Sequence, residues 1–378
     1  MKFARSVDLY IFNLNYLRWW ANFLGLDIMT PNYKPNIRTY LGMVGTSVFF
    51  FGGPYTVWYY WANWIKLMES AAVYGFVIQG VAKIYTVVRY HGFFVIMYGR
   101  LEQFHREHGQ HRKNNATLLQ NIHRIHQLSK LISAQYAIAM IVLSLVPIAC
   151  YLMNGEAELP TAMLVPFTDP SVPWHFALNM VGQYYLMLAA WAGFSASESV
   201  ILLFVASLAG YADVLKNTVD EMNGALVQVG HGKDRTEVRR KLLEIARLHQ
   251  RVLEYEHDLE ERYYLNNWVQ VFSSVFTLTG ALFHCLFSRQ FSMYTLAMAG
   301  VTQLFELCLL GTILSIKNEE IESSFYDSLW YLMDRSEQRT FLILFHKSQH
   351  AIEMTIASMA PLNIVTFVSV SSGRRICA

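Results

Sequence analysis

Long apolar stretches alternate with shorter polar ones along this chain of 378 residues. Each apolar stretch approaches or exceeds the ~20 residues that a helix needs to cross the hydrocarbon core of a bilayer. Six of them lie at roughly 38–62, 70–98, 131–152, 178–209, 267–288 and 291–316, and a seventh lies near 350–371. The pattern therefore predicts an all-α integral membrane protein with seven transmembrane helices.

A second pattern lies between Thr236 and Asn267, where apolar residues recur every three or four positions with charged residues between them. The apolar positions are Leu242, Ile245, Leu248, Val252, Tyr255, Leu259 and Tyr263. This spacing predicts a helix with one apolar stripe. The helix either packs on its own protein or belongs to a cytoplasmic helical anchor layer shared between subunits. The Gly-rich segment before it, from Glu221 to Thr236, is predicted to be a loop.

The composition agrees with a membrane protein. Hydrophobic residues make up 54% of the chain, charged residues 15%, and the mean hydropathy is +0.25, which is more apolar than an ordinary soluble domain. No basic stripe interleaved with stacking aromatic residues is present, so nucleic acid is not an expected partner, whereas membrane lipid is. The 4 cysteines form no disulfide framework. The N-terminal residues lack a cleavable signal sequence and suit an interfacial amphipathic helix.

The lysines and arginines are concentrated on one side of the predicted spans. Twenty-six of the 30 lie in the segments Lys2–Arg38, Lys83–Lys130, Lys216–Arg262 and Lys317–Lys347, whereas Met153–Leu178 contains none. Because positive charge marks cytoplasmic loops, the N-terminus is predicted to be cytoplasmic and, after seven spans, the C-terminus extracellular. This orientation is the inverse of a G-protein-coupled receptor and excludes that class.

No catalytic motif is present. The chain has no Gly-rich phosphate loop, no HExxH and no GxSxG, so neither an enzyme nor a bound cofactor is expected. Five histidines lie close together before the third span: His105, His108, His111, His123 and His126. Their spacing, without carboxylate or Cys ligands, is a weak metal signal. A solvated cytoplasmic helix end is the favoured interpretation.

Four ionisable residues lie within apolar spans, where each costs about 2.5–3.5 kcal/mol on insertion scales. For Lys83, Glu198 and Glu306 we expect pairing within the bundle. Glu353 begins a polar face of the last span that continues with Thr355, Met359, Asn363, Thr366 and Val370. These six residues are candidates for lining a water-filled pore, although a polar seam between helices would show the same pattern.

Aromatic, aliphatic and sulfur-containing side chains form stripes on the outer halves of several spans. The stripe residues are Tyr74, Val77, Ile78, Met140, Ser144, Ile148, Tyr184, Met187, Leu188, Trp191, Phe272 and Phe276. Such stripes are either plain helix packing or the wall of an apolar cavity with a few polar groups. The second alternative would hold a small volatile ligand.

The last fifty residues resemble the C-terminal signature of insect odorant receptors. The residues that carry the resemblance are, in order, Tyr326, Trp330-Tyr331, Arg339, Ser348-Gln349, Thr355, Pro361-Leu362 and Thr366-Phe367. It extends weakly over the whole chain through length, span number, orientation and the long connection between the fourth and fifth spans.

The resemblance implies the tuned, odorant-binding subunit of an odorant-gated cation channel. Its partners would be a small volatile odorant and the odorant co-receptor, assembled as a heterotetramer in the plasma membrane of olfactory sensory neurons. We accordingly divide the chain into an N-terminal interfacial segment (1–37), six transmembrane helices with the ligand pocket and cytoplasmic extensions (38–316), and an anchor helix with the pore-lining last helix (317–378). The alternatives are a gustatory-type receptor channel that needs no co-receptor, and a membrane transporter.

The tail departs from the family pattern. After Thr366-Phe367 the family continues with an aliphatic and Ser/Tyr-rich stretch, whereas this chain ends VSVSSGRRICA. This ending shortens the predicted last helix and brings Arg374 and Arg375 near its outer end. We expect SSGRRICA to be foreign to the functional receptor.

Overall fold

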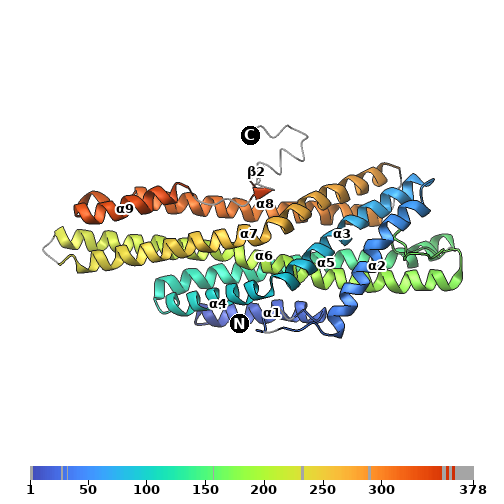
Figure 1. Cartoon of the computed structure of the whole chain (residues 1–378), viewed down its shortest axis with the longest axis horizontal. Coiled ribbons are helices and arrows are strands. Elements are labelled where there is room, and N and C mark those ends of the chain that lie inside the picture. Colours follow the sequence, from blue (N-terminus) through green and yellow to red (C-terminus); the bar gives the residue numbers. More distant parts are fainter. Residues whose placement is uncertain are drawn as a thin grey trace.

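The structure is a computed structural model that describes residues 3–26, 29–31, 33–155, 157–230, 234–287 and 291–350, with short backbone segments at 355–356 and 360–361. Its helices form an elongated bundle (Figure 1). The elements are α1 (Ser6–Phe23), α2 (Ile37–Tyr59), α3 (Trp64–Arg89), α4 (His91–His108), α5 (Arg112–Asn154), α6 (Pro173–Gly230), α7 (Thr236–Phe287), α8 (Phe291–Tyr326), the 3-10 helix η1 (Trp330–Leu332), α9 (Arg335–Ser348), β1 (Thr355–Ile356) and β2 (Ala360–Pro361).

The first six predicted spans correspond to helices in the structure. Among the described residues, α3, α5, α6, α7 and α8 are each long and apolar enough to cross a membrane. α2 covers the first predicted span, but its sequence is diluted by glycine and threonine and contains Pro54. The second predicted span is divided at Tyr90, where α3 ends and α4 begins.

α6 is the central helix of the bundle and packs against α1, α2, α5, α7 and α8. Every residue from 198 to 208 is buried, so this part of the helix has no exposed face. Apolar side chains on all sides suit a helix either for lipid or for a protein interior, and here neighbouring helices cover every side of this part of α6. The other helices therefore pack around α6.

The apolar stripe predicted in the first half of α7 is confirmed, because all of its residues are buried. The Tyr255 hydroxyl also donates a hydrogen bond to the carbonyl oxygen of Phe204 at 3.1 Å, which fixes α7 against α6. Arg251 and Glu254, between the apolar positions, are exposed. This half of α7 packs on its own protein through α6, α8 and α9, and a layer shared between subunits stays a prediction.

α9 is tied to the start of α7 by ion pairs. The guanidinium of Arg235 lies 3.1 Å from both Asp334 and Glu337, and Arg239 Nε lies 3.2 Å from Glu337 Oε1. Asp334 and Glu337 also form the capping box that begins α9. The helix predicted after residue 317 as part of the anchor layer is thus held at its N-terminal end by charge.

The loop predicted from Glu221 to Thr236 is wrong up to Gly230, because α6 continues to that residue. Met222, Ala225 and Leu226 are buried on one side of this last part of α6. Tertiary packing of an apolar face stabilises a helix more than local propensity does. The glycines in the segment therefore did not end the helix where sequence reasoning expected.

The last predicted span, 350–371, was expected to be a continuous helix, but the structure has two short strands at 355–356 and 360–361. β1 and β2 pair antiparallel, with Thr355 opposite Pro361. The other predicted pore residues, Glu353, Met359, Asn363, Thr366 and Val370, lie outside the described residues, as does the tail with Arg374 and Arg375.

α1 packs one face against α4, α5 and α6 and leaves the other face open. Tyr10 and Leu17 are fully buried, whereas Phe12, Trp19 and Phe23 are exposed. A helix with one buried face and an aromatic exposed face is compatible with a position at the membrane surface. The interfacial role of this segment stays a prediction.

The histidines before the third span do not form a solvated cluster, so that interpretation was wrong for His105 and His126, both of which are buried. His105 stacks on Tyr10 with 5.0 Å between ring centroids, and burial lowers the pKa of His105 to about 4. His126 Nδ1 lies 3.0 Å from Asn13 Oδ1. Both histidines hold α1 in place. The described residues contain no group of three or more His, Cys, Asp or Glu side chains that could hold a metal ion.

Asn115 begins a glycosylation sequon, Asn115-Ala116-Thr117, yet its side chain is engaged at the start of α1. Its Oδ1 accepts a hydrogen bond from the Ser6 backbone N–H at 2.8 Å, and its Nδ2 donates to the carbonyl oxygen of Ala4 at 2.9 Å. We predict that Asn115 is unmodified in cells, because the contact occupies Nδ2 and the charge pattern predicts a cytoplasmic position for the sequon.

Mass spectrometry of the protein isolated from a eukaryotic membrane tests this prediction. As a control, an Asn-Gly-Thr insertion after Phe167, a residue that is 89% exposed in the segment predicted to be extracellular, should acquire a glycan. A glycan found on Asn115 itself would overturn the predicted orientation.

Candidate functional site

A cavity of about 190 Å³ lies between helices α2, α3, α5 and α6, and residues of α1, α4, α7 and α8 also line it. Most of its wall is apolar, and includes Val77, Met140, Leu143, Leu186 and Met187. Apolar cavities lined by such residues hold small apolar molecules.

Glycines keep the cavity open. Gly42 and Gly80 lie on its wall, and a Cβ added at Gly80 would meet only Thr46 Cγ2, at 3.7 Å. A Cβ added at Gly42 would meet no heavy atom within 4 Å among the described residues. The helix backbones therefore border empty space at these positions, where larger side chains would fill the cavity.

Aromatic rings form one wall of the cavity. Phe194 stacks on Tyr136 with ring centroids 5.5 Å apart, and meets Phe76 edge-on at 5.8 Å. Trp191 is fixed on the same side, because its Nε1 donates a hydrogen bond to the carbonyl oxygen of Ser133 at 3.2 Å. These contacts hold the rings in place, so the shape of this wall is pre-organised.

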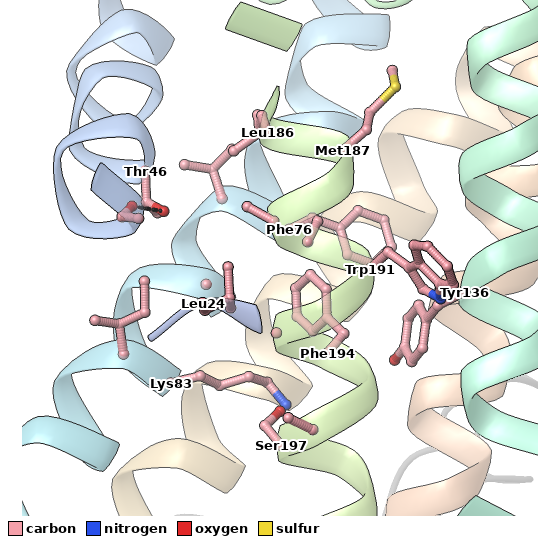
Figure 2. Close-up of a pocket in the computed structure, with 18 of the residues that line it drawn as sticks. Leu24, Thr46, Phe76, Lys83, Tyr136, Leu186, Met187, Trp191, Phe194 and Ser197 are labelled. Carbon is pink, nitrogen blue, oxygen red and sulfur yellow. Dashed lines mark hydrogen bonds between the residues drawn. The ribbon is translucent and has the colours of Figure 1, made fainter. Parts of the chain in front are cut away.

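One end of the cavity is polar and carries a buried ion pair. Lys83 Nζ lies 2.5 Å from Glu198 Oε1 and 3.1 Å from Gln270 Oε1. Side-chain exposure is only 9% for Lys83 and 1% for Glu198. Figure 2 shows the Lys83 amine and Ser197 at this end, and Leu186 and Met187 at the other. The prediction that Lys83 and Glu198 pair within the bundle is confirmed.

Further hydrogen bonds extend this polar end toward α7 and α8. Gln303 Nε2 donates to the Tyr136 hydroxyl at 2.8 Å, and Ser274 Oγ donates to Gln303 Oε1 at 3.3 Å. For Glu306 the predicted pairing is not seen at Oε1, because this buried oxygen has no hydrogen-bond partner among the described residues. Four helices, α3, α5, α7 and α8, are thus connected through polar side chains next to the cavity.

The structure brings some of the predicted ligand-binding residues to the cavity. Val77, Met140, Met187 and Trp191 line it. Ser144 lies one step behind the wall, with its hydroxyl 3.9 Å from the Met187 sulfur. Whether any of them binds a ligand stays a proposal.

Other predicted residues lie elsewhere. Four of them are between 40% and 60% exposed and lie on the outer surface of the bundle: Ile148, Leu188, Phe272 and Phe276. Helical periodicity correctly showed that these residues share a face with their neighbours in the stripe. It could not show that the face lies on the outside of the bundle, because lipid-facing and cavity-facing positions are equally apolar.

Ile78, Tyr74 and Tyr184 also lie outside the cavity lining. The Tyr74 hydroxyl donates to the carbonyl oxygen of Phe50 at 3.1 Å, and its ring lies against Gly53. The Tyr184 hydroxyl donates to the carbonyl oxygen of Ser144 at 3.0 Å. These two tyrosines therefore join neighbouring helices rather than forming the cavity wall.

Sequence reasoning missed several lining residues, among them Gly80, Tyr136, Phe194 and Ser197. Gly80 and Ser197 carry no aromatic or sulfur signal, and Tyr136 and Phe194 lie deeper in their spans than the outer stripes considered. The buried charge of Lys83 was the available signal, because a lysine within an apolar span marks a polar environment.

Comparisons with known proteins concern most of the chain. A family model described as 7tm odorant receptor matches residues 63–373. "Putative odorant receptor 83c" of Drosophila melanogaster is 24% identical over 373 residues, covering 94% of this chain and 92% of that protein. Odorant receptor 22c of the same species is 21% identical over 221 residues, covering 55% of this chain and 54% of that protein.

The fold is similar to solved structures. The insect olfactory receptor OR5 from Machilis hrabei in complex with eugenol superposes with a TM-score of 0.76 at 15% identity, covering 96% of each chain. A second OR5 structure gives a TM-score of 0.72 at 14% identity, with the same coverage. The predicted all-α membrane fold with seven transmembrane helices is thereby confirmed.

Proposed function

Because this chain belongs to the odorant receptor family, we propose that it is the odorant-binding subunit of a heteromeric ligand-gated cation channel. Family membership makes it a multi-pass membrane receptor that senses odorants, and not an enzyme. The finer proposal adds an odorant co-receptor as the partner subunit, a heterotetrameric assembly, and the plasma membrane of olfactory sensory neurons as the location.

The apolar cavity of about 190 Å³ is the observation that carries the ligand-binding part of the proposal. Micromolar affinity corresponds to about −8.2 kcal/mol, so a ligand of about ten heavy atoms needs ~0.8 kcal/mol per atom. That value is high for a small ligand and requires nearly complete enclosure. The similar fold of OR5, solved in complex with eugenol, supports a ligand of this size for the present chain.

We place the pore at the last span and keep the predicted orientation. Glu353, Thr355, Met359, Asn363, Thr366 and Val370 would line the pore in the assembled channel. The domain boundaries at 37 and 316 and a cytoplasmic N-terminus complete the proposed arrangement. The charge asymmetry between Met153–Leu178, which has no lysine or arginine, and the four basic segments on the other side of the spans supports this orientation.

Current recording in cells tests the channel proposal. We predict an odorant-evoked cation current when this chain is co-expressed with the odorant co-receptor, and none when it is expressed alone. With Asn363→Cys, a charged thiol reagent applied during the response should reduce the current, because a pore position is reached through water. Ile138→Cys, at a position on α5 that is 60% exposed, is the control that the reagent should not affect.

Three outcomes would contradict the proposal in different ways. Current from this chain without the co-receptor would favour a gustatory-type channel. Odorant transport without current would favour a transporter. Equal reagent effects at Asn363 and Ile138 would remove the last span from the pore.

A further inference from the structure

At the polar end of the cavity, some hydrogen-bond donors have no acceptor among the described residues. The Lys83 ammonium has three protons, and among the described residues two acceptors face it, Glu198 Oε1 and Gln270 Oε1. The Phe194 ring, with its centroid 5.4 Å from Nζ, borders the remaining side. Lys83 therefore keeps one N–H that no described oxygen accepts, at an end of the cavity where it is part of the wall.

Ser197 provides a second donor beside Lys83. Its Oγ is buried and has no hydrogen-bond partner among the described residues, and Ser197 belongs to the cavity wall. The Tyr136 hydroxyl, across the Phe194 ring, accepts a hydrogen bond from Gln303 and can still donate one. These donors belong to three different helices, α3, α5 and α6.

Two acceptor side chains, Glu198 and Gln183, already receive two hydrogen bonds each. Glu198 receives Lys83 at one carboxylate oxygen and Gln270 Nε2, at 3.3 Å, at the other. Gln183 Oε1, elsewhere on the wall, accepts both the backbone N–H and the hydroxyl of Thr161. On the cavity wall itself, Lys83, Ser197 and Tyr136 thus offer donors that no described oxygen accepts, whereas the unpartnered Glu306 Oε1 does not belong to the wall. An unmade buried hydrogen bond is costly, so a ligand oxygen that accepts these donors would be favoured over a hydrocarbon group.

We propose that the ligand is a neutral, mainly apolar molecule with an oxygen acceptor at one end, a carbonyl above all, which receives hydrogen bonds from Lys83 and Ser197. This inference rests on the proposed odorant-binding function of the cavity. The apolar remainder of the ligand lies along Phe194 and Trp191 toward Leu186 and Met187.

Charge excludes two other ligand classes. An amine would bring a second cation next to Lys83. An ionised carboxylic acid would add a negative charge beside Lys83, whose positive charge Glu198 already neutralises. An uncompensated charge is expensive in a buried site. The neutral acceptor is the chemistry that the existing pair accommodates without a change in net charge.

Matched pairs of volatile compounds test the proposal in cells that express this chain with the co-receptor. The probes are octane with 2-octanone, limonene with carvone, and propylbenzene with propiophenone, together with octylamine and octanoic acid. In each pair that activates, the carbonyl compound should act at a concentration at least about tenfold lower than its hydrocarbon, as expected for one or two hydrogen bonds. The amine and the acid should be weaker than 2-octanone.

Two serines on α6 provide a matched pair of variants. Ser197→Ala should lower the carbonyl preference by about threefold to tenfold, the effect of one hydrogen bond. Ser195→Ala is the control, because the Ser195 hydroxyl is also buried without a partner among the described residues but does not line the cavity. Lys83→Met combined with Glu198→Gln removes both charges of the ion pair together and should abolish most of the preference.

The outcomes separate this inference from the function on which it rests. Equal potency of carbonyl compound and hydrocarbon, or equal effects of Ser195→Ala and Ser197→Ala, would overturn the acceptor proposal while leaving an odorant-gated channel in place. Failure of every probe to evoke current, in cells where a co-receptor agonist does, would count against the small-volatile function itself and against the acceptor proposal with it.

Discussion

Replacement of Glu198 by alanine is expected to lower the free energy of unfolding by about 3–5 kcal/mol, because it leaves the Lys83 ammonium buried without its charge partner. Glu198 is 1% exposed and Lys83 is 9% exposed, and the two groups are 2.5 Å apart. The loss should appear as a lower melting temperature of the purified protein in detergent and as less receptor at the cell surface.

An exposed ion pair gives the matched control. Arg240 and Glu237 interact on the surface of α7 with side-chain exposures of 59% and 53%, and such pairs contribute about 0–1 kcal/mol. Glu237→Ala should therefore have little effect. Lys83→Met with Glu198→Gln should recover most of the stability lost in Glu198→Ala, since buried pairs are replaceable when both charges are removed. Equal melting temperatures for Glu198→Ala and Glu237→Ala would show that the buried pair does not stabilise the fold.

Gly80→Leu is expected to raise the half-maximal concentration of an activating odorant by at least about tenfold, ~1.4 kcal/mol in affinity, or to abolish the response. Among the described residues, the Cβ at this position would meet only Thr46 Cγ2, at 3.7 Å, so the added side chain extends into the cavity instead of clashing with a helix. Leucine also favours a helix more than glycine does. The receptor should therefore reach the surface in normal amounts, and concentration–response curves normalised to surface receptor measure the effect.

Gly99→Leu on α4 is the same substitution away from the cavity. A Cβ at Gly99 would meet no heavy atom within 4 Å among the described residues, and Gly99 does not line the cavity. Odorant sensitivity should be unchanged in this variant. If Gly80→Leu and Gly99→Leu respond alike, the ligand binds somewhere other than this cavity.

Part of the site could be predicted from the sequence. The aromatic and sulfur stripes made the outer halves of several spans a candidate for a cavity, with plain helix packing as the alternative, and Val77, Met140, Met187 and Trp191 do line one. Phe272 and Phe276 obey the same helical spacing but are exposed on α7. Helical periodicity establishes which residues share a face, whereas the direction of that face in space depends on neighbouring helices.

The amino-acid sequence by itself determined the elements whose stability is local or set by the solvent. These are the long apolar helices, the charge asymmetry between the loops, and the buried stripe of α7. The helices and the stripe follow from hydrophobic transfer and helical geometry, which act on a segment whatever its neighbours are. The charge asymmetry is read directly from the positions of the lysines and arginines.

Only the tertiary structure decided which groups meet. It paired Lys83 of α3 with Glu198 of α6, which are 115 residues apart in the chain, and it left Gly80 facing open space. It also extended α6 through a glycine-containing segment that the sequence predicted to be a loop. In a membrane protein nearly every span is apolar on several sides, so composition cannot distinguish a surface facing lipid from one facing a helix or a cavity. Packing makes that distinction, because close contact between specific side chains exists only once the helices are assembled.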